Sequence, residues 1–204
     1  RRQRQMCIRD RYSFQSVFQT YFQFCTQELS SFYFDIRKDV LYCDPKTSLK
    51  RKATLKVLDI LFFRLTTWFS PILTFTMEEV YLERFPEFEN SVHLLDIPSN
   101  EKDWYNPKHA LRWDKIRNVR RVVTGAIEVL RQEKVIGSSL ETCPVIHIKD
   151  KELFNIIESV DMSEICITSG VKIEFSMNSI ADNCFIIDDV PDVGVICQTA
   201  QGKK

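Results

Sequence analysis

Three arginines in one stretch of the chain have the spacing of a phosphate-binding surface. At roughly 100° per residue on a helix, Arg117, Arg120 and Arg121 fall within an arc of about 100°, to one side of an apolar stripe. Guanidinium groups that share a helix face can contact the phosphates of a nucleic-acid backbone. A solvated helix face, balanced by neighbouring acids, is the alternative interpretation of the same pattern.

Other side chains extend this candidate surface if the first two helices pack beside the arginine helix. The further basic candidates for RNA binding are Arg37, Lys38, Arg51, Lys52 and Lys134. The aromatic rings of Tyr42 and Trp104 could stack on unpaired bases, whereas Trp113 fits a core or rim position better.

The net charge alone argues against a nucleic-acid partner, but its distribution does not. The 28 basic and 28 acidic side chains cancel to zero, whereas nucleic-acid-binding domains usually carry a basic excess. Residues 35–56 and 108–134 sum to +4 and +5, and residues 77–106 and 135–204 sum to −6 each. This segregation permits a basic face with acidic surfaces elsewhere.

The residue types that carry enzymatic chemistry do not form a recognisable site. The three histidines have no partner at a metal or triad spacing, no glycine-rich phosphate loop occurs, and no two of the seven cysteines form a C-x-x-C pair. The odd cysteine count fits a reducing cytosol rather than a disulfide framework. A thiol-dependent hydrolase that matches a cysteine with His147 is an alternative, but it requires a thiol with a lowered pKa. We expect no catalytic or metal-binding residue in this chain.

The distribution of glycine predicts two halves with different structures. All five glycines lie at or after position 125, and apolar residues recur at helical spacing before it, so we expect an α-helical first half. Its predicted helices span residues 13–36, 48–69, 77–85 and 108–134. Strands are predicted at 145–148, 165–168, 171–175, 184–187 and 194–198, with a short helix at 152–160. The fold class is therefore α+β, a mainly α-helical bundle followed by a small α/β module.

Three local patterns position these helices. Asn106 and Pro107 supply an N-cap and a proline at the first turn of the fourth helix. Thr76 and Glu79 have the spacing of a capping box for the third helix. On the second helix, the predicted packing face includes Leu49, Val57 and Trp68.

The first eleven residues differ from everything that follows. They contain five arginines and one aspartate, and the string resembles a translated sequencing adapter, so we expect residues 1–11 to be a non-native tail. No apolar run reaches the length of a membrane span, and no secretion signal is present, so we expect a soluble, cytoplasmic chain without a membrane partner.

Four strings in this order resemble the anticodon-binding region of isoleucyl-tRNA synthetases, which are class I aminoacyl-tRNA synthetases. They are Ser31–Asp39 with Leu41–Tyr42, Ser70–Val80, Ser91–Leu94 and Glu133–Glu141. The first pair would also admit the related valine and leucine enzymes, whereas the string from Lys134 to Glu141 points to the isoleucine enzyme. The resemblance covers residues 12–204.

This resemblance implies a domain organisation and a function. It implies a helical anticodon-binding bundle at 12–140 and a small α/β junction module at 141–204, which ends before the zinc knuckle of many bacterial members. The implied partner is tRNA-Ile, for the ATP-dependent attachment of isoleucine. Because the HIGH and KMSKS signatures of the family are absent, we expect a fragment that is inactive alone and holds no cofactor. ATP with magnesium, and zinc where present, would bind to the parent enzyme, which we expect to be a monomer. A helical protein–protein docking module is the alternative from another functional class.

Overall fold

The computed structural model describes residues 13–86, 91–99, 104–176 and 183–200. The chain divides into two compact units, residues 1–102 and residues 103–204. The tail expected at residues 1–11 lies outside the described residues.

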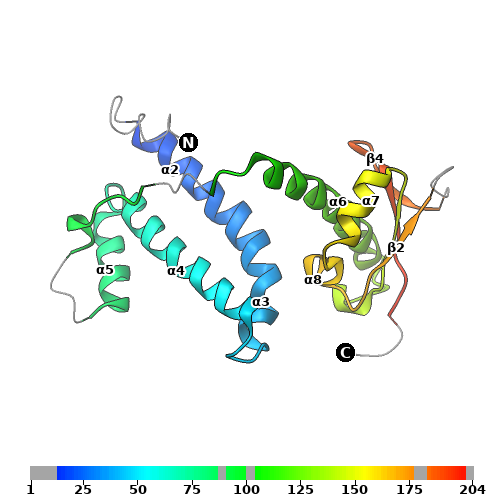
Figure 1. Cartoon of the computed structure of the whole chain (residues 1–204), viewed down its shortest axis with the longest axis horizontal. Coiled ribbons are helices and arrows are strands. Elements are labelled where there is room, and N and C mark those ends of the chain that lie inside the picture. The colour runs from blue at the N-terminus through cyan, green and yellow to red at the C-terminus, as the bar shows by residue number, and fades with distance from the viewer. Residues whose placement is uncertain (1–12, 87–90, 100–103, 177–182, 201–204) are drawn as a thin grey trace. The chain divides into compact units, whose positions relative to one another are not determined.

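One long helical rod opens the first unit (Figure 1). It consists of α2 (Phe14–Gln23), the π-helical segment η1 (Phe24–Phe34) and α3 (Asp35–Tyr42). The hydroxyl of Ser31 donates to the carbonyl of Thr26, five residues earlier, which matches the wider turn of a π-helix. The helix expected to end at residue 36 therefore continues to residue 42.

Two further helices complete the first unit. The helix α4 (Leu49–Phe69) begins after Ser48, whose side-chain oxygen accepts a hydrogen bond from the Arg51 N–H. The helix α5 (Thr74–Arg84) begins earlier than expected, without a side-chain cap. The predicted capping box is wrong because Thr76 already lies inside this helix.

Aromatic side chains connect α2 to α4 in the first unit. The rings of Tyr21 and Trp68 stack at 5.3 Å, and Phe18 meets Phe69 edge-on at 6.1 Å. The predicted packing face of α4 is partly wrong, because Leu49 is 83% exposed and Val57 is 39% exposed. Arg64, Thr66 and Thr67 are buried instead.

A short 3₁₀ turn closes the first unit against α5. This turn, η2 (Val92–Leu94), begins after Ser91, and Val92 is almost completely buried. The Glu78 carboxylate accepts hydrogen bonds from the Ser91 hydroxyl at 2.8 Å and the Val92 N–H at 2.9 Å. The string Ser91–Leu94 thus has a structural explanation within this unit.

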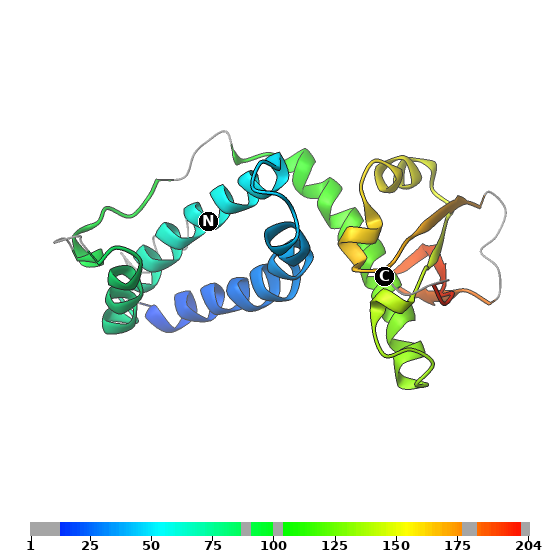
Figure 2. The ribbon, with the colours of Figure 1, turned by 90° about the horizontal axis from the view of Figure 1, so that it is seen from below.

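The second unit is built on a long helix and a four-stranded sheet (Figures 1 and 2). The helix α6 (Pro107–Gln132) is capped by the Asn106 side chain, as predicted, and is followed by the turn η4 (Ser139–Glu141). The strands are β1 (Val145–Ile148), β2 (Lys172–Phe175), β3 (Phe185–Ile187) and β4 (Val190–Ile196).

The sheet is mixed, with the order β2-β1-β4-β3. The pair β1/β2 is parallel, and β4 runs antiparallel to both β1 and β3. Two helices, α7 (Lys151–Glu158) and α8 (Met162–Cys166), form the crossover between β1 and β2. A strand was expected at 165–168, but Asp161 caps two amides of α8 and Ile167 ends it in the left-handed region, so this prediction is wrong.

The hydrophobic core of the second unit lies between α6 and the sheet. It is formed by the apolar stripe of α6 together with inward residues of β1, β4, α7 and α8, including Ile116, Val123, Ile146, Ile157 and Val195. The fold class, a mainly helical region followed by a small α/β module, is confirmed.

The unit boundary differs from the division expected at residue 140. The helix α6 packs on β3 and β4 and buries its apolar stripe there, so it belongs to the same compact unit as the sheet. Within the described ranges, no helix combines the length and apolar character needed to cross a membrane.

Candidate nucleic-acid interface

The three predicted arginines all lie on α6 and border the same hollow. This hollow has a volume of about 450 Å³, and its lining residues are Asp114, Arg117, Asn118, Arg120, Arg121 and Thr124. We call these six residues the arginine face. The buried stripe of Ile116, Val119 and Val123 holds this helix against the sheet and leaves the arginine face outside the core.

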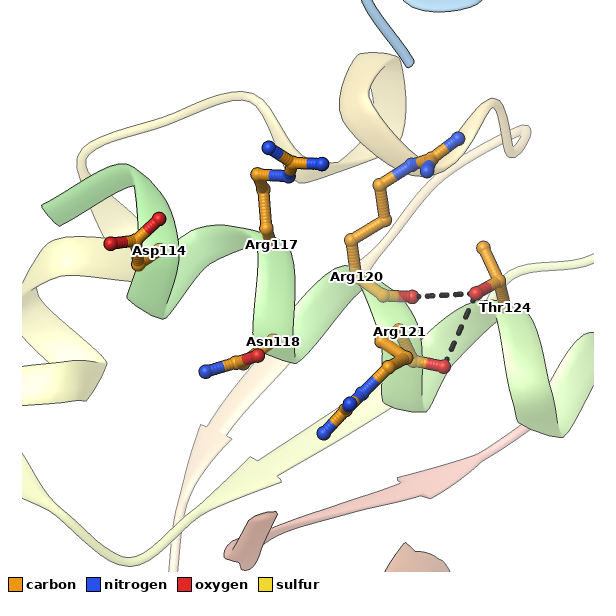
Figure 3. Close-up of a pocket in the computed structure, with 6 residues that line it drawn as sticks. All are labelled: Asp114, Arg117, Asn118, Arg120, Arg121 and Thr124. Atoms are coloured by element: carbon orange, nitrogen blue, oxygen red, sulfur yellow. Dashed lines mark hydrogen bonds between the residues drawn. The ribbon is translucent and has the colours of Figure 1, made fainter. Parts of the chain in front are cut away.

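The arginines differ in direction and in exposure. Figure 3 shows Arg117 and Arg120 extending to one side of α6, and Arg121 extending to the other side with Asn118. Arg117 and Arg120 are half-buried, whereas Arg121 is exposed. The face therefore has two edges, and a different neighbour approaches each.

Arg120 is tied to the neighbouring helix α8. Its Nε donates a hydrogen bond of 2.9 Å to the carbonyl of Ile165, near the end of α8. A cation at the C-terminal end of a helix interacts favourably with the helix dipole and with the unsatisfied carbonyls there. Arg120 therefore connects α6 to α8.

Arg121 meets a carboxylate at the opposite edge. Its guanidinium lies 3.5 Å from Asp189, in the turn between β3 and β4, and the two side chains are 51% and 76% exposed. An exposed ion pair of this length contributes about 0 to 1 kcal/mol. Arg121 is thus weakly paired and accessible to solvent.

Thr124 closes the end of the arginine face. Its hydroxyl donates to the carbonyls of Arg120 and Arg121 at 3.0 and 3.2 Å, as the dashed lines in Figure 3 show. This bonding satisfies the hydroxyl within the helix.

Four predicted basic residues lie in the first unit, on two adjacent helices. On α3, Arg37 is half-buried and Lys38 is exposed; a 2.9 Å hydrogen bond to Asp35 raises the pKa of the Lys38 amine above its ordinary value. On α4, Arg51 and Lys52 lie in the first turn, together with Lys50, and that turn contains no acidic residue.

The basic residues in the first turn of α4 do not stabilise this helix. Cations at a helix N-terminus are repelled by the positive end of the helix dipole. Nearby, Tyr42 is 85% exposed at the end of α3. The connection between α3 and α4 therefore combines basic side chains with an exposed aromatic ring, the composition of a surface that binds unpaired nucleotides.

The last predicted residue, Lys134, lies in a tight turn after α6. Its backbone adopts a φ of 58°, in the left-handed region, and its side chain is exposed. The turn is held by the Glu141 carboxylate, which accepts a hydrogen bond from the Gly137 N–H at 3.3 Å. Residues Glu133–Glu141 thus connect α6 to the sheet through a turn that is stabilised by a hydrogen bond between two of its own residues.

Two cysteines of the second unit, Cys166 and Cys197, have the opposite properties from those of a nucleophile. Burial raises the pKa of the Cys166 thiol to about 12 and that of Cys197 to about 11. The Nδ1 atom of His147 lies 3.5 Å from Glu174 and within 3.3 Å of the Ser176 hydroxyl, with no cysteine among these partners. The thiol-hydrolase alternative therefore gains no support from these residues.

In the described ranges, no three histidine, cysteine, aspartate or glutamate side chains are grouped to hold a metal ion.

Four residues at this surface were not predicted from the sequence. Asp114, Asn118 and Thr124 lie three or four positions from the arginines, so helical spacing could have identified them. Asp189 is 68 residues from Arg121 along the chain, and no local pattern signals that contact.

One known family matches most of the chain. The profile of the family described as "Anticodon-binding domain of tRNA ligase" matches residues 8–147. This span includes the described residues of the first unit, α6 and the start of the sheet.

Several similar curated proteins carry the same name. The isoleucine--tRNA ligases of Ruegeria pomeroyi, Bartonella henselae and Brucella abortus are 48%, 47% and 45% identical to the chain over 193, 195 and 195 residues. The alignments cover 95% or 96% of this chain and 20% of each relative. The chain therefore spans about a fifth of the length of the curated relatives it matches.

Proposed function

Because the chain belongs to the family of anticodon-binding domains of tRNA ligases, we propose that it binds the anticodon arm of tRNA-Ile within an isoleucine–tRNA ligase. The binding supports the ATP-dependent attachment of isoleucine to that tRNA. ATP with magnesium, and zinc where present, act in other parts of the longer protein, which we propose to be a cytoplasmic monomer. The shared name of the relatives supports isoleucine over valine or leucine.

The arginine face of α6 is the observation that carries this proposal. Three guanidinium groups within two turns of one helix border a hollow outside the core. Each phosphate that they neutralise releases condensed counterions from the RNA, which gives salt-dependent affinity without any base contact.

The three arginines have different roles in the proposed complex. Arg121 is exposed, and the half-buried Arg117 extends outward on the other side of α6, so both can reach a phosphate. Arg120 is a positioning residue, because its Nε is bonded to the Ile165 carbonyl. The further basic residues Arg37, Lys38, Arg51, Lys52 and Lys134 add phosphate contacts along the RNA, and Tyr42 stacks on an unpaired base.

The test is a salt series of tRNA-Ile binding to the whole chain. The variant Arg117→Gln/Arg121→Gln keeps Arg120 and its bond to α8. The matched control Lys108→Gln/Arg131→Gln removes the same charge from the two ends of the same helix. We expect the Arg117/Arg121 variant to bind more weakly, with a salt slope smaller by roughly one per lost phosphate contact, and the control to change much less.

The results would separate the competing functions. Equal affinity and slope for the two variants would contradict the assignment of the arginine face. Binding of tRNA-Ile and tRNA-Val with equal affinity would contradict the isoleucine assignment. Indifference to tRNA, with salt-insensitive binding of a protein partner, would support the docking module.

A further inference from the structure

A carboxylate from a distant part of the chain occupies one edge of the arginine face. Asp189 lies 3.5 Å from the Arg121 guanidinium, although the two residues are 68 positions apart. The contact is made within the second unit, between α6 and the β3–β4 hairpin. The position expected for a phosphate oxygen beside Arg121 thus already faces a negative charge of the protein.

The hairpin that carries Asp189 is packed closely on α6. One turn beyond Arg121, Gly125 faces the ring of Phe185 in β3, and a Cβ at this glycine would stand only 2.9 and 3.1 Å from two ring carbons. The missing side chain allows β3 to approach α6 at this point. Ile187 also lies near Gly125, 3.7 Å from the same Cβ position.

The turn itself is short, so it holds the carboxylate near the helix. Ile187 of β3 pairs with Val190 of β4, which leaves only Asp188 and Asp189 between the two strands. A two-residue hairpin loop has few backbone conformations. Packing at Gly125 and the short turn together place Asp189 beside Arg121.

The strength of the Arg121–Asp189 ion pair determines how it affects RNA binding. A buried ion pair would remove Arg121 from any binding surface, because its separation would leave an unpaired buried charge. The Arg121–Asp189 pair is exposed on both sides, so the carboxylate can be replaced by a phosphate and return to water at little cost. The replacement nevertheless lowers the net gain of the phosphate contact.

We infer that Asp189 is an internal competitor of the RNA phosphate at Arg121 and sets the affinity of the arginine face for RNA. This inference rests on the proposed function. In the free protein Asp189 pairs with Arg121, and in the complex a phosphate oxygen takes its place. Asp189 weakens binding to any polyanion at this edge, so a bound RNA must gain its affinity from contacts elsewhere as well.

The experiment compares four variants of the whole chain in tRNA-Ile binding at low and moderate salt. Asp189→Asn removes the competing charge. Asp188→Asn is the matched control, because it removes the same charge one residue away, and Asp188 makes no ion pair within the described part of the chain. Arg121→Gln and Arg121→Gln/Asp189→Asn complete a double-mutant cycle.

We expect Asp189→Asn to tighten binding about two- to fivefold at low salt, the range of an exposed ion pair, and Asp188→Asn to have a smaller effect. In the Arg121→Gln background, the Asp189→Asn change is expected to have no more effect than Asp188→Asn has in the wild-type chain.

Two outcomes would overturn the inference in distinguishable ways. If Arg121→Gln weakens binding but Asp189→Asn and Asp188→Asn have equal effects, Asp189 is not a competitor and the proposed function stands. If neither Arg121→Gln nor the Arg117→Gln/Arg121→Gln variant weakens binding, the arginine face itself is refuted, and the inference with it.

Discussion

At the residue scale, the local chemistry of each side chain decides which candidates can serve the proposed function. Helical spacing placed three arginines on one arc, and the structure gives each a different environment. Arg120 bonds to a carbonyl 45 residues away, and Arg121 meets a carboxylate 68 residues away. The sequence contains the charges and their spacing on α6, but contacts with α8 and the β3–β4 turn depend on tertiary packing and could not be predicted from it.

Because Cys166 is buried, we predict that the free energy of unfolding depends on pH in the alkaline range. The pKa of this thiol is raised from an ordinary 9.0 to about 12 in the folded chain, chiefly because burial disfavours the thiolate. The unfolded chain therefore loses the proton first as pH rises. The stabilisation is fully present below about pH 9 and is lost between pH 9 and 12, at about 1.4 kcal/mol per pH unit.

The measurement is urea unfolding of the wild-type chain and Cys166→Ala at pH 8 and pH 10.5. The substitution removes the titrating group, so the wild-type chain should lose its stability advantage over the variant at the higher pH. An advantage that is the same at both pH values would show that Cys166 does not contribute to the alkaline loss.

At the element scale, helical periodicity predicted the long helices well and the short elements less well. The Asn106 cap and the apolar stripe of α6 were predicted because both are local patterns. The segment around Ile165 looked like a strand because it is short and apolar, but Asp161 caps two amides of α8 and makes it helical. On α4, periodicity placed Leu49 and Val57 inside, yet both side chains are exposed.

The contact of α6 with β3 at Gly125 yields a prediction about packing. Gly125→Val adds a branched side chain where even a Cβ would stand 2.9 Å from Phe185, so we expect a loss of about 1–3 kcal/mol in the free energy of unfolding. Gly125→Ala should cost less, because alanine favours the helix by about 1 kcal/mol over glycine and the ring of Phe185 needs to move only slightly.

Denaturant unfolding of the two variants checks this expectation. Asn118→Val is the control, since it adds a branched residue to the same helix at an exposed position. If Gly125→Val and Asn118→Val lose equal stability, the close approach of β3 to α6 has no energetic consequence.

At the scale of the whole molecule, the two units differ in how they bury apolar surface. The second unit has a continuous core between α6 and the sheet. In the first unit, the buried apolar residues are distributed along separate helices and turns; they are Val17, Leu29, Ile36, Val40, Phe69, Tyr81 and Val92. Local opening is easier where fewer buried contacts are lost.

We therefore expect hydrogen exchange to distinguish the two units. Amides of α6, β1 and β4 should open with higher free energies than amides of α2 and α5, in hydrogen–deuterium exchange of the whole chain across a denaturant series. Equal opening free energies throughout would indicate that the chain unfolds as a single cooperative body.

The π-helical segment Phe24–Phe34 has a consequence for changes in chain length. Because hydrogen bonds of a π-helix span five residues instead of four, such a segment stores extra residues relative to an α-helix of the same length. Loss of one residue there can be absorbed by a return to α geometry, with the downstream faces of α3 preserved. The same loss within α6 would rotate every following side chain by about 100° and move the basic groups off the outer face. Deletions among related proteins should therefore be tolerated in the π-helical segment Phe24–Phe34 and excluded from α6.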